Sequence, residues 1–203
     1  KPEFKAQVQK MFGLPQNPDR PLIAMISRLV YQKGLSLIDF AKFDLMSQPA
    51  DFVFLGTGEH GFENMLIWVS NNSSNMRAWI DFKPELSETL YKGADMFLMP
   101  SLFEPCGISQ MIAMKYGTPP IVRAVGGLDD TVISYPNEHA NGFKFLTYDA
   151  RSMVDEIKKA IWTYIDRRDE FNKIMHNAIK SKFTWQDSAI KYKLLYLDAL
   201  GRK

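Results

Sequence analysis

The sequence predicts an α/β fold built on an open parallel sheet with helices on both faces. Short apolar runs recur along the chain without the strict polar alternation of a half-exposed strand. Such runs are typical of parallel strands that are buried on both faces. Segments with a helical spacing of apolar residues separate the runs, and this alternation of strand and helix favours an open α/β sheet.

The order of the elements follows from the positions of these runs. The expected strands are Pro21–Ser27, Phe52–Leu55, Ala78–Phe82, Met96–Met99 and Pro120–Arg123. The expected helices between them are Leu35–Met46, Phe62–Val69, Glu85–Ala94 and Ser109–Tyr116. Helical spacing resumes near residue 149 and continues to the end of the chain. We therefore expect one domain over residues 1–203, with a core at about 20–148 and a tail of three helices at about 149–203.

The last helix of this tail is expected to carry a wide apolar surface. The residues that form it are Tyr192, Leu195, Tyr196, Leu197 and Leu200. Two interpretations stay open. The surface packs against this domain, or it docks against a partner domain outside these residues, because large exposed apolar patches mark interfaces.

Composition argues against several classes of function. The net charge is +2 and the 25 Lys and Arg residues are spread along the chain, so we expect no nucleic-acid partner. No apolar run approaches the roughly 18 residues that a membrane span needs, so we expect no membrane partner. The single cysteine, Cys106, permits no disulfide within the chain and favours a reducing compartment. The three histidines lack metal-ligand spacing, and we expect no metal.

The residues after each run are the candidates for a site, because open α/β sheets bind ligands beyond the carboxyl ends of their strands. Arg28 and Lys33 follow the first run, in a turn that opens a helix. Two cations beside helix amides can clamp a diphosphate. The alternative is that both are ordinary surface charges.

Two glycines and an aromatic residue follow the second and third runs. Gly56 and Gly58 would let the backbone approach a ligand closely, although a tight turn explains them equally well. Phe82 ends the third run, where its ring can stack on a base or pack in the core.

A carboxylate and further glycines follow the fourth and fifth runs. Glu104 lies between a strand and a helix, where its carboxylate can grip sugar hydroxyls or stabilise a developing positive charge. The amides of Cys106 and Gly107 would open the next helix. Gly126 and Gly127 enter a further helix and would offer backbone amides to an anion.

Together these segments resemble the motifs of bacterial glycogen synthases and plant starch synthases. The resemblance is clear from Ser27 to about Gly142 and weaker in the helical tail. The segments that carry it are Ser27-Arg28-Leu29 with Gln32-Lys33-Gly34-Leu35, Leu55-Gly56-Thr57-Gly58, Pro100-Ser101-x-Phe103-Glu104-Pro105-Cys106-Gly107 with Gln110, Ala113-Met114 and Tyr116-Gly117-Thr118, Pro120-Ile121-Val122-Arg123, and Gly126-Gly127-Leu128-x-Asp130-Thr131-Val132.

The resemblance implies the GT-B architecture, in which two Rossmann-like domains face a cleft, and this chain is similar to the C-terminal, nucleotide-sugar-binding one. It implies transfer of glucose from ADP-glucose to the 4-OH of a growing α-1,4-glucan (glycogen or starch), with retention of configuration and without a metal or cofactor. Most acceptor contacts would lie in the N-terminal domain, so the isolated chain is expected to be inactive. The implied location is the cytoplasm of a bacterium, or a plastid if the source is a plant.

The resemblance also implies roles for individual residues. Carried over by motif, Arg28 and Lys33 would bind the donor diphosphate and stabilise the leaving nucleotide. Glu104 would contact the transferred glucose. The other donor contacts implied are Cys106 and Gly107 beside the glucose, Ser109 and the Gly126-Gly127-Leu128 loop at phosphate or ribose, and Phe82 on the base. Ser109 stands where Thr is more usual, which keeps the hydroxyl.

Alternative functions differ from this one in donor or in catalysis. One is another GT-B enzyme, such as a transferase that uses UDP-glucose or a sugar-nucleotide epimerase. Another is a nucleotide-sugar-binding module without catalysis, which the retained Arg28, Lys33 and Glu104 disfavour. A nucleophilic role for Cys106 is also disfavoured, because no His or Asp lies near it in the sequence.

Overall fold

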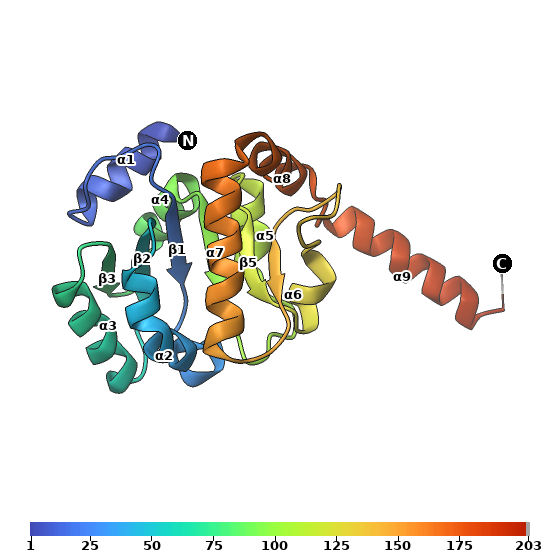
Figure 1. The fold of residues 1–203 in the computed structure, drawn as a ribbon. Coiled ribbons are helices and arrows are strands. Elements are labelled where there is room, and N and C mark those ends of the chain that lie inside the picture. Colours follow the sequence, from blue (N-terminus) through green and yellow to red (C-terminus); the bar gives the residue numbers. More distant parts are fainter. Residues whose placement is uncertain (202–203) are drawn as a thin grey trace.

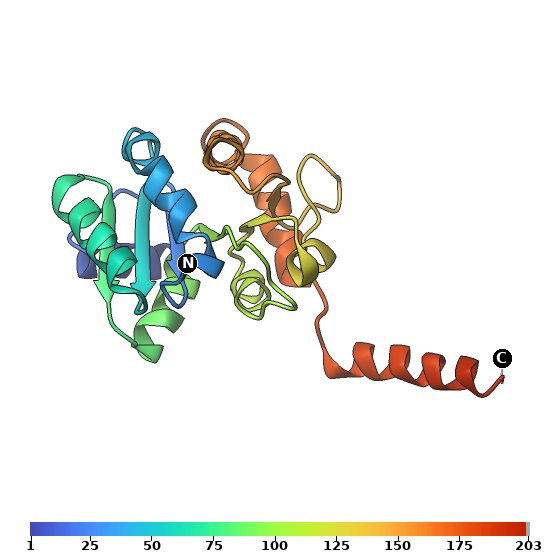
Figure 2. The ribbon, with the colours of Figure 1, turned by 90° about the horizontal axis from the view of Figure 1, so that it is seen from below.

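The computed structural model describes residues 1–201, the side chain of residue 187 excepted, and within them a six-stranded parallel sheet forms the centre (Figure 1). The strands are β1 (Leu22–Ile26), β2 (Asp51–Gly56), β3 (Met76–Ile80), β4 (Met96–Met99), β5 (Pro120–Arg123) and β6 (Phe143–Phe145). Their order across the sheet is β3-β2-β1-β4-β5-β6. The order reverses between β1 and β4, so the switch point where open α/β sheets bind ligands lies at this boundary. Figure 2 looks toward the edge at which the strands end.

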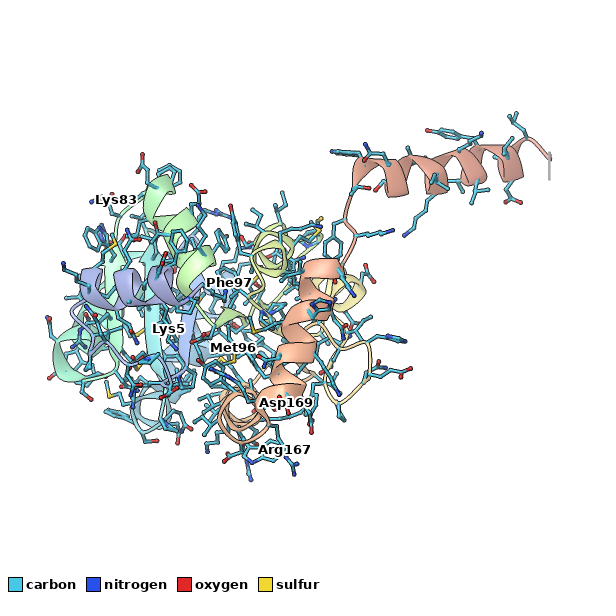
Figure 3. The ribbon with its side chains drawn as sticks, turned by 90° about the horizontal axis from the view of Figure 1, so that it is seen from above. Lys5, Lys83, Met96, Phe97, Arg167 and Asp169 are labelled. Atoms are coloured by element: carbon cyan, nitrogen blue, oxygen red, sulfur yellow. The ribbon has the colours of Figure 1, made fainter. Side chains whose placement is uncertain are left out.

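Both faces of the sheet are buried, because successive residues of a strand point to opposite faces and each face meets helices. On β1, Ile23 lies in one core cluster and Leu22 in the other. Met96 and Phe97, neighbours on β4 that Figure 3 labels, divide in the same way. Burial on both sides explains why the strands carry unbroken apolar runs.

Three helices cover the first face of the sheet. They are α2 (Leu35–Met46), α3 (His60–Asn72) and α7 (Ala150–Asp166). Helix α7 begins after Asp149, whose carboxylate accepts a hydrogen bond from the Ser152 amide at 2.9 Å. This side-chain cap satisfies one of the amides that a helix start leaves without a partner.

Shorter helices cover the second face. They are α1 (Pro2–Met11), α4 (Pro84–Gly93), α5 (Ser109–Lys115) and α6 (Gly126–Thr131). Helix α1 is tied to the sheet by Lys5, whose ammonium lies 2.7 Å from the Asp95 carboxylate. The same carboxylate oxygen accepts a hydrogen bond from the Leu22 amide at 2.8 Å, which fixes the start of β1.

The last two helices differ in how they meet the rest of the molecule. Helix α8 (Arg168–Lys180) packs beside α5 and α7, with Phe171 fully buried. Helix α9 (Trp185–Ala199) extends away from the body in Figures 1 and 2. Most of its large apolar side chains are exposed, with Tyr192 at 56% and Leu195 at 59%, while Leu197 is half-buried. Packing of this surface against the domain, one of the two interpretations, is therefore not the arrangement seen here.

The predicted α/β fold class is confirmed, and the five predicted strands are present, β4 and β5 with the predicted ends and β1, β2 and β3 with shifted ends. Helix α2 begins and ends at the predicted residues. Strand β6, helix α1 and the short 3₁₀ turn η1 (Tyr31–Lys33) were not predicted from the sequence. Helices α7 and α8, expected in a tail, belong to the core. Within residues 1–201, no helix combines the length and the apolar character needed to cross a membrane.

Candidate functional site

Two neighbouring cavities lie at the carboxyl ends of the strands. The first, of about 210 Å³, lies at the switch point between β1 and β4, and its polar lining comes from Ser27, Arg28, Lys33, Ser101 and Ser109. The second, of about 200 Å³, lies toward the ends of β2 and β3. Arg28 lines both cavities, so they form one continuous candidate site at the edge where the fold favours a ligand.

Lys33 and Glu104 form an ion pair at the first cavity. The Lys33 ammonium lies 2.5 Å from the Glu104 carboxylate, and the two side chains are only 19% and 11% exposed. The Ser101 hydroxyl donates to the same carboxylate oxygen at 3.4 Å. Because the pair is partly shielded from water, its charges act on their surroundings more strongly than those of an exposed pair. The structure thus brings together the two residues that the sequence assigned to diphosphate and to sugar.

Arg28 is exposed and lies where the two cavities meet. Within residues 1–201, no hydrogen bond or ion pair engages its guanidinium. A guanidinium offers five donors in a planar fork that matches the oxygens of a phosphate. The Arg28 guanidinium can therefore bind an anion directly, whereas the Lys33 ammonium is already paired with Glu104.

Backbone contacts between two loops hold the Lys33–Glu104 pair in place. The Leu102 amide donates to the Gln32 carbonyl at 2.8 Å, and the Gln32 side-chain amide donates to the Phe103 carbonyl at 3.2 Å. Gly34 has a φ of +81°, and a Cβ there would meet the Pro100 carbonyl oxygen at 2.1 Å. Only glycine fits this close, left-handed turn, which explains the glycine directly after Lys33.

The glycine pair before α6 packs against the loop that carries Glu104. A Cβ on Gly126 would meet the Glu104 carbonyl oxygen at 2.3 Å, and one on Gly127 would meet the Cys106 carbonyl oxygen at 2.0 Å. The Gly127 amide, expected to face an anion, donates to the Glu104 carbonyl at 3.1 Å. The Leu128 side chain is fully buried in the core. The structure thus gives these residues a role in supporting the loop.

The glycines after β2 also meet the chain itself. A Cβ on Gly56 would lie 1.9 Å from the Ser27 carbonyl oxygen, and one on Gly58 would lie 2.2 Å from the Leu29 carbonyl oxygen. Leu29 and Gly58 form an isolated parallel bridge. The close approach at both glycines therefore brings the Arg28 loop against the end of β2.

The remaining predicted residues lie around the same edge. Phe82 lies beyond the end of β3, is 83% exposed and lines the second cavity, so core packing is excluded for its ring. Lys83, labelled in Figure 3, lies over the Trp79 ring beside it. The amides of Cys106 and Gly107, expected to open the next helix, lie instead in the loop ahead of α5, whose N-cap is Ile108 and whose first residue is Ser109. Cys106 is exposed.

Sequence reasoning missed Ser101, which bonds Glu104 and lines the first cavity. Its position at the end of a predicted strand was the available signal. Across the described chain, no three His, Cys, Asp or Glu side chains come together as metal ligands.

Comparison with known proteins finds relatives over nearly the whole chain. Glycogen synthases from Bacillus cereus (strain Q1) and Clostridioides difficile (strain 630) are 40% and 43% identical over 199 and 201 residues, which is 97% and 98% of this chain. The chain spans only 42% of the length of each.

Solved structures give the same picture. The catalytic domain of starch synthase IV from Arabidopsis thaliana, bound to ADP and acarbose, superposes with a TM-score of 0.87 at 33% identity, over 98% of this chain and 43% of that one. A glycosyltransferase from Rickettsia africae shares the fold at 20% identity, with a TM-score of 0.72 over 100% of this chain and 53% of that one.

The resemblance inferred from the sequence motifs is therefore confirmed. Residues 7–178 match the family described as glycosyl transferases group 1. This chain belongs to that family, and among its members it is similar to the glycogen and starch synthases.

Proposed function

We propose that this chain is the nucleotide-sugar-binding half of a glucosyltransferase that moves glucose from ADP-glucose to the 4-OH of an α-1,4-glucan, with retention of configuration. One observation carries the proposal. Arg28 and Lys33 line a cavity at the switch point of the sheet, and Glu104 is paired with Lys33 there. The similarity to glycogen synthases, and to a starch synthase bound to ADP, supports the choice of donor and acceptor.

The three side chains suit the charges that the transfer creates. When the bond between the glucose C1 and the diphosphate breaks, the electron pair leaves with the diphosphate and the sugar becomes oxocarbenium-like. Arg28 offers a fixed fork and Lys33 a mobile point charge to the departing phosphates. Glu104 places a carboxylate beside the sugar. Fixed charges of this kind in a partly enclosed site lower the energy of a charged transition state.

The cavities suggest how the donor lies. We place the diphosphate and glucose in the first cavity, beside Arg28, Lys33 and Ser109, and the base in the second cavity against the exposed ring of Phe82. An aromatic face can stack on adenine or on uracil, so Phe82 raises the affinity for the donor without selecting between the two bases. The loop of Cys106 and Gly107 then lies beside the glucose.

The glucan would be bound mainly by the rest of the synthase. Because this chain spans 42% of its relatives, we place the N-terminal GT-B domain outside these residues. The isolated chain then binds the donor but does not elongate glucan. The exposed apolar surface of α9, which includes Tyr192 and Leu195, would dock on that domain, since large exposed apolar patches mark interfaces. A cytoplasmic location, or a plastid in a plant, belongs to the same proposal.

Calorimetry with ADP, ADP-glucose and UDP-glucose tests the proposal on the chain itself. We expect the adenine ligands to bind and Lys33→Ala to weaken that binding by about tenfold, the worth of one charge-assisted contact. Lys42→Ala is the matched control, because Lys42 pairs with Asp39 on α2 and lines neither cavity.

Preference for UDP-glucose would replace the donor assignment with that of another GT-B transferase. If no ligand binds to the isolated chain, the same titration is run on the intact synthase. Equal effects of Lys33→Ala and Lys42→Ala in the intact synthase would refute the contact between Lys33 and the diphosphate. Binding without any glucosyl transfer by the intact protein would indicate a module that only binds the nucleotide sugar.

A further inference from the structure

Arg123 reaches the loop that carries Glu104, although it comes from a neighbouring strand. It is the last residue of β5, which pairs with β4 in the sheet. Its Nε donates to the Ser101 carbonyl at 2.8 Å, and its Nη2 donates to the Leu102 carbonyl. One guanidinium therefore holds two successive carbonyls just before Glu104.

The same guanidinium also lies over an aromatic ring. Its central carbon lies 5.5 Å from the centre of the Tyr148 ring, a cation–π distance. The Tyr148 hydroxyl lies 3.1 Å from the Ser36 hydroxyl on α2, and its ring makes a T-shaped contact with the ring of Tyr31, the first residue of η1, at 6.4 Å between centres. Arg123 thus joins the Glu104 loop to the segment that carries Lys33.

The Glu104 loop depends on such tethers. Residues 100–108 form neither helix nor strand, so no ladder of backbone hydrogen bonds fixes them. An arginine can bond two carbonyls at once because its donors lie in a rigid plane, whereas a lysine ammonium is a single point. A small error in the placement of a group that acts on the transition state has a large effect on rate.

We propose that Arg123 is a positioning residue that sets the Glu104 carboxylate against Lys33 and the reacting sugar. This inference rests on the proposed function of Glu104. Arg123 itself lines neither cavity and is not expected to touch the donor. It acts by fixing the backbone at Ser101 and Leu102, so its loss is expected to lower kcat and leave donor affinity nearly unchanged.

The chain offers a matched control for the substitution Arg123→Lys. Arg77 on β3 also donates to backbone carbonyls, those of Ser73 at 2.7 Å and Met76 at 2.8 Å, and it lines neither cavity. Arg77→Lys therefore removes the same kind of contact at a distance from the site. Both variants are compared with the unchanged protein in the intact synthase.

Two measurements are made on each protein. Hydrogen exchange reports the loop directly, because the amides of Leu102 and Gly127 are bonded to Gln32 and Glu104. We expect Arg123→Lys to accelerate exchange at these amides by about tenfold, the effect of losing one charged hydrogen bond. We expect kcat to fall by about tenfold while KM for the donor changes by less than about twofold, the pattern of an interaction made in the transition state. Arg77→Lys should change neither quantity.

The outcomes separate this inference from the function on which it rests. Unchanged exchange at Leu102 and Gly127 in Arg123→Lys would show that Arg123 does not fix the backbone of the Glu104 loop, and would overturn the inference. Faster exchange with normal kcat, while Glu104→Gln loses turnover, would overturn the positioning role and leave the proposed function standing. Normal turnover in Glu104→Gln would refute both the role of Glu104 and this inference.

A second variant covers the case in which Arg123→Lys fails to fold. Tyr148→Leu keeps an apolar side chain but removes the ring face that Arg123 packs on. We expect a smaller change in the same direction, about threefold in kcat, as cation–π contacts are weaker than charged hydrogen bonds. Unchanged kcat and unchanged loop exchange in a folded Tyr148→Leu would count against a role for the contact between Arg123 and Tyr148.

Discussion

The Lys33 ammonium lies 2.5 Å from the Glu104 carboxylate, although 71 residues separate them in the chain. The Glu104 carboxylate therefore attracts the Lys33 ammonium directly, and a donor diphosphate must compete with Glu104 for Lys33. A carboxylate that faces the sugar also weakens the hold of its lysine on the phosphates. Removing the charge of Glu104 should therefore strengthen binding of the diphosphate and slow turnover.

Glu104→Gln tests this opposition. We expect ADP to bind about threefold to tenfold more tightly, because Lys33 is released to the diphosphate in a partly shielded site. We expect turnover of the intact synthase to fall by about a hundredfold or more, because the charge beside the sugar is lost. Calorimetry and initial rates measure the two effects, and the melting temperature should change little.

Glu156→Gln is the control for that experiment. Glu156 pairs with Lys159 at 3.0 Å and is 12% exposed, close to the 11% of Glu104, but it lies on α7 and lines neither cavity. It should leave affinity and turnover unchanged. A large loss of melting temperature in Glu104→Gln, with normal turnover of the folded fraction, would make Glu104 a structural residue.

Gly127→Ala tests whether the glycine pair supports the Glu104 loop. Its new methyl group would lie 2.0 Å from the Cys106 carbonyl oxygen, so the loop must move. We expect loss of turnover together with a destabilisation of about 1–3 kcal/mol, as overpacking costs. Gly61→Ala on α3 is the control, since a Cβ there meets nothing within 4 Å. That change should stabilise the protein by up to about 1 kcal/mol. Equal effects of the two substitutions on turnover would refute the supporting role.

Much of this site could be predicted from the sequence, because the carboxyl ends of parallel strands meet at one edge. Arg28, Lys33 and Glu104 were predicted to share that edge; in the structure Arg28 and Lys33 line the first cavity, and Glu104 pairs with Lys33. The sequence could not reveal that the Gly127 amide bonds Glu104, since a glycine pair has the same pattern whether it meets a ligand or its own chain.

The parts that sequence reasoning missed depend on tertiary contacts. Strand β6 has only three residues with Lys144 in the middle, so it carries no apolar run, and its pairing with β5 identifies it. Arg123 looked like the end of a strand motif, because its contacts with Ser101 and Leu102 arise only when β4 and β5 lie side by side.

Asp149 gives a prediction about stability and pH. The hydrogen bond from the Ser152 amide lowers the pKa of the Asp149 carboxyl below its ordinary value of 3.8. A carboxyl with a lowered pKa contributes stability above its ordinary value and loses it as the pH falls through the folded-state pKa. Asp149→Asn keeps a capping oxygen but not the charge. The unchanged protein should melt at a higher temperature than Asp149→Asn at pH 7, and this difference should be smaller at pH 3, below the ordinary value. A difference that is the same at both values would rule out the charge as its cause.

The exposed surface of α9 gives the last prediction. Tyr192 and Tyr196 are 56% and 64% exposed, with their ring centres 6.4 Å apart, and α9 extends away from the domain. Replacing Tyr192, Leu195 and Tyr196 by serine should leave the melting temperature of the isolated chain nearly unchanged, because exposed side chains contribute little to stability. In the intact synthase the same change should lower both the melting temperature and turnover, because the surface that docks on the second domain is lost. Since serine is a poorer helix former than leucine, Lys191→Ser and Lys193→Ser together serve as the control for helix propensity. Equal effects of the triple change and this control in the intact protein would show that α9 has no docking role.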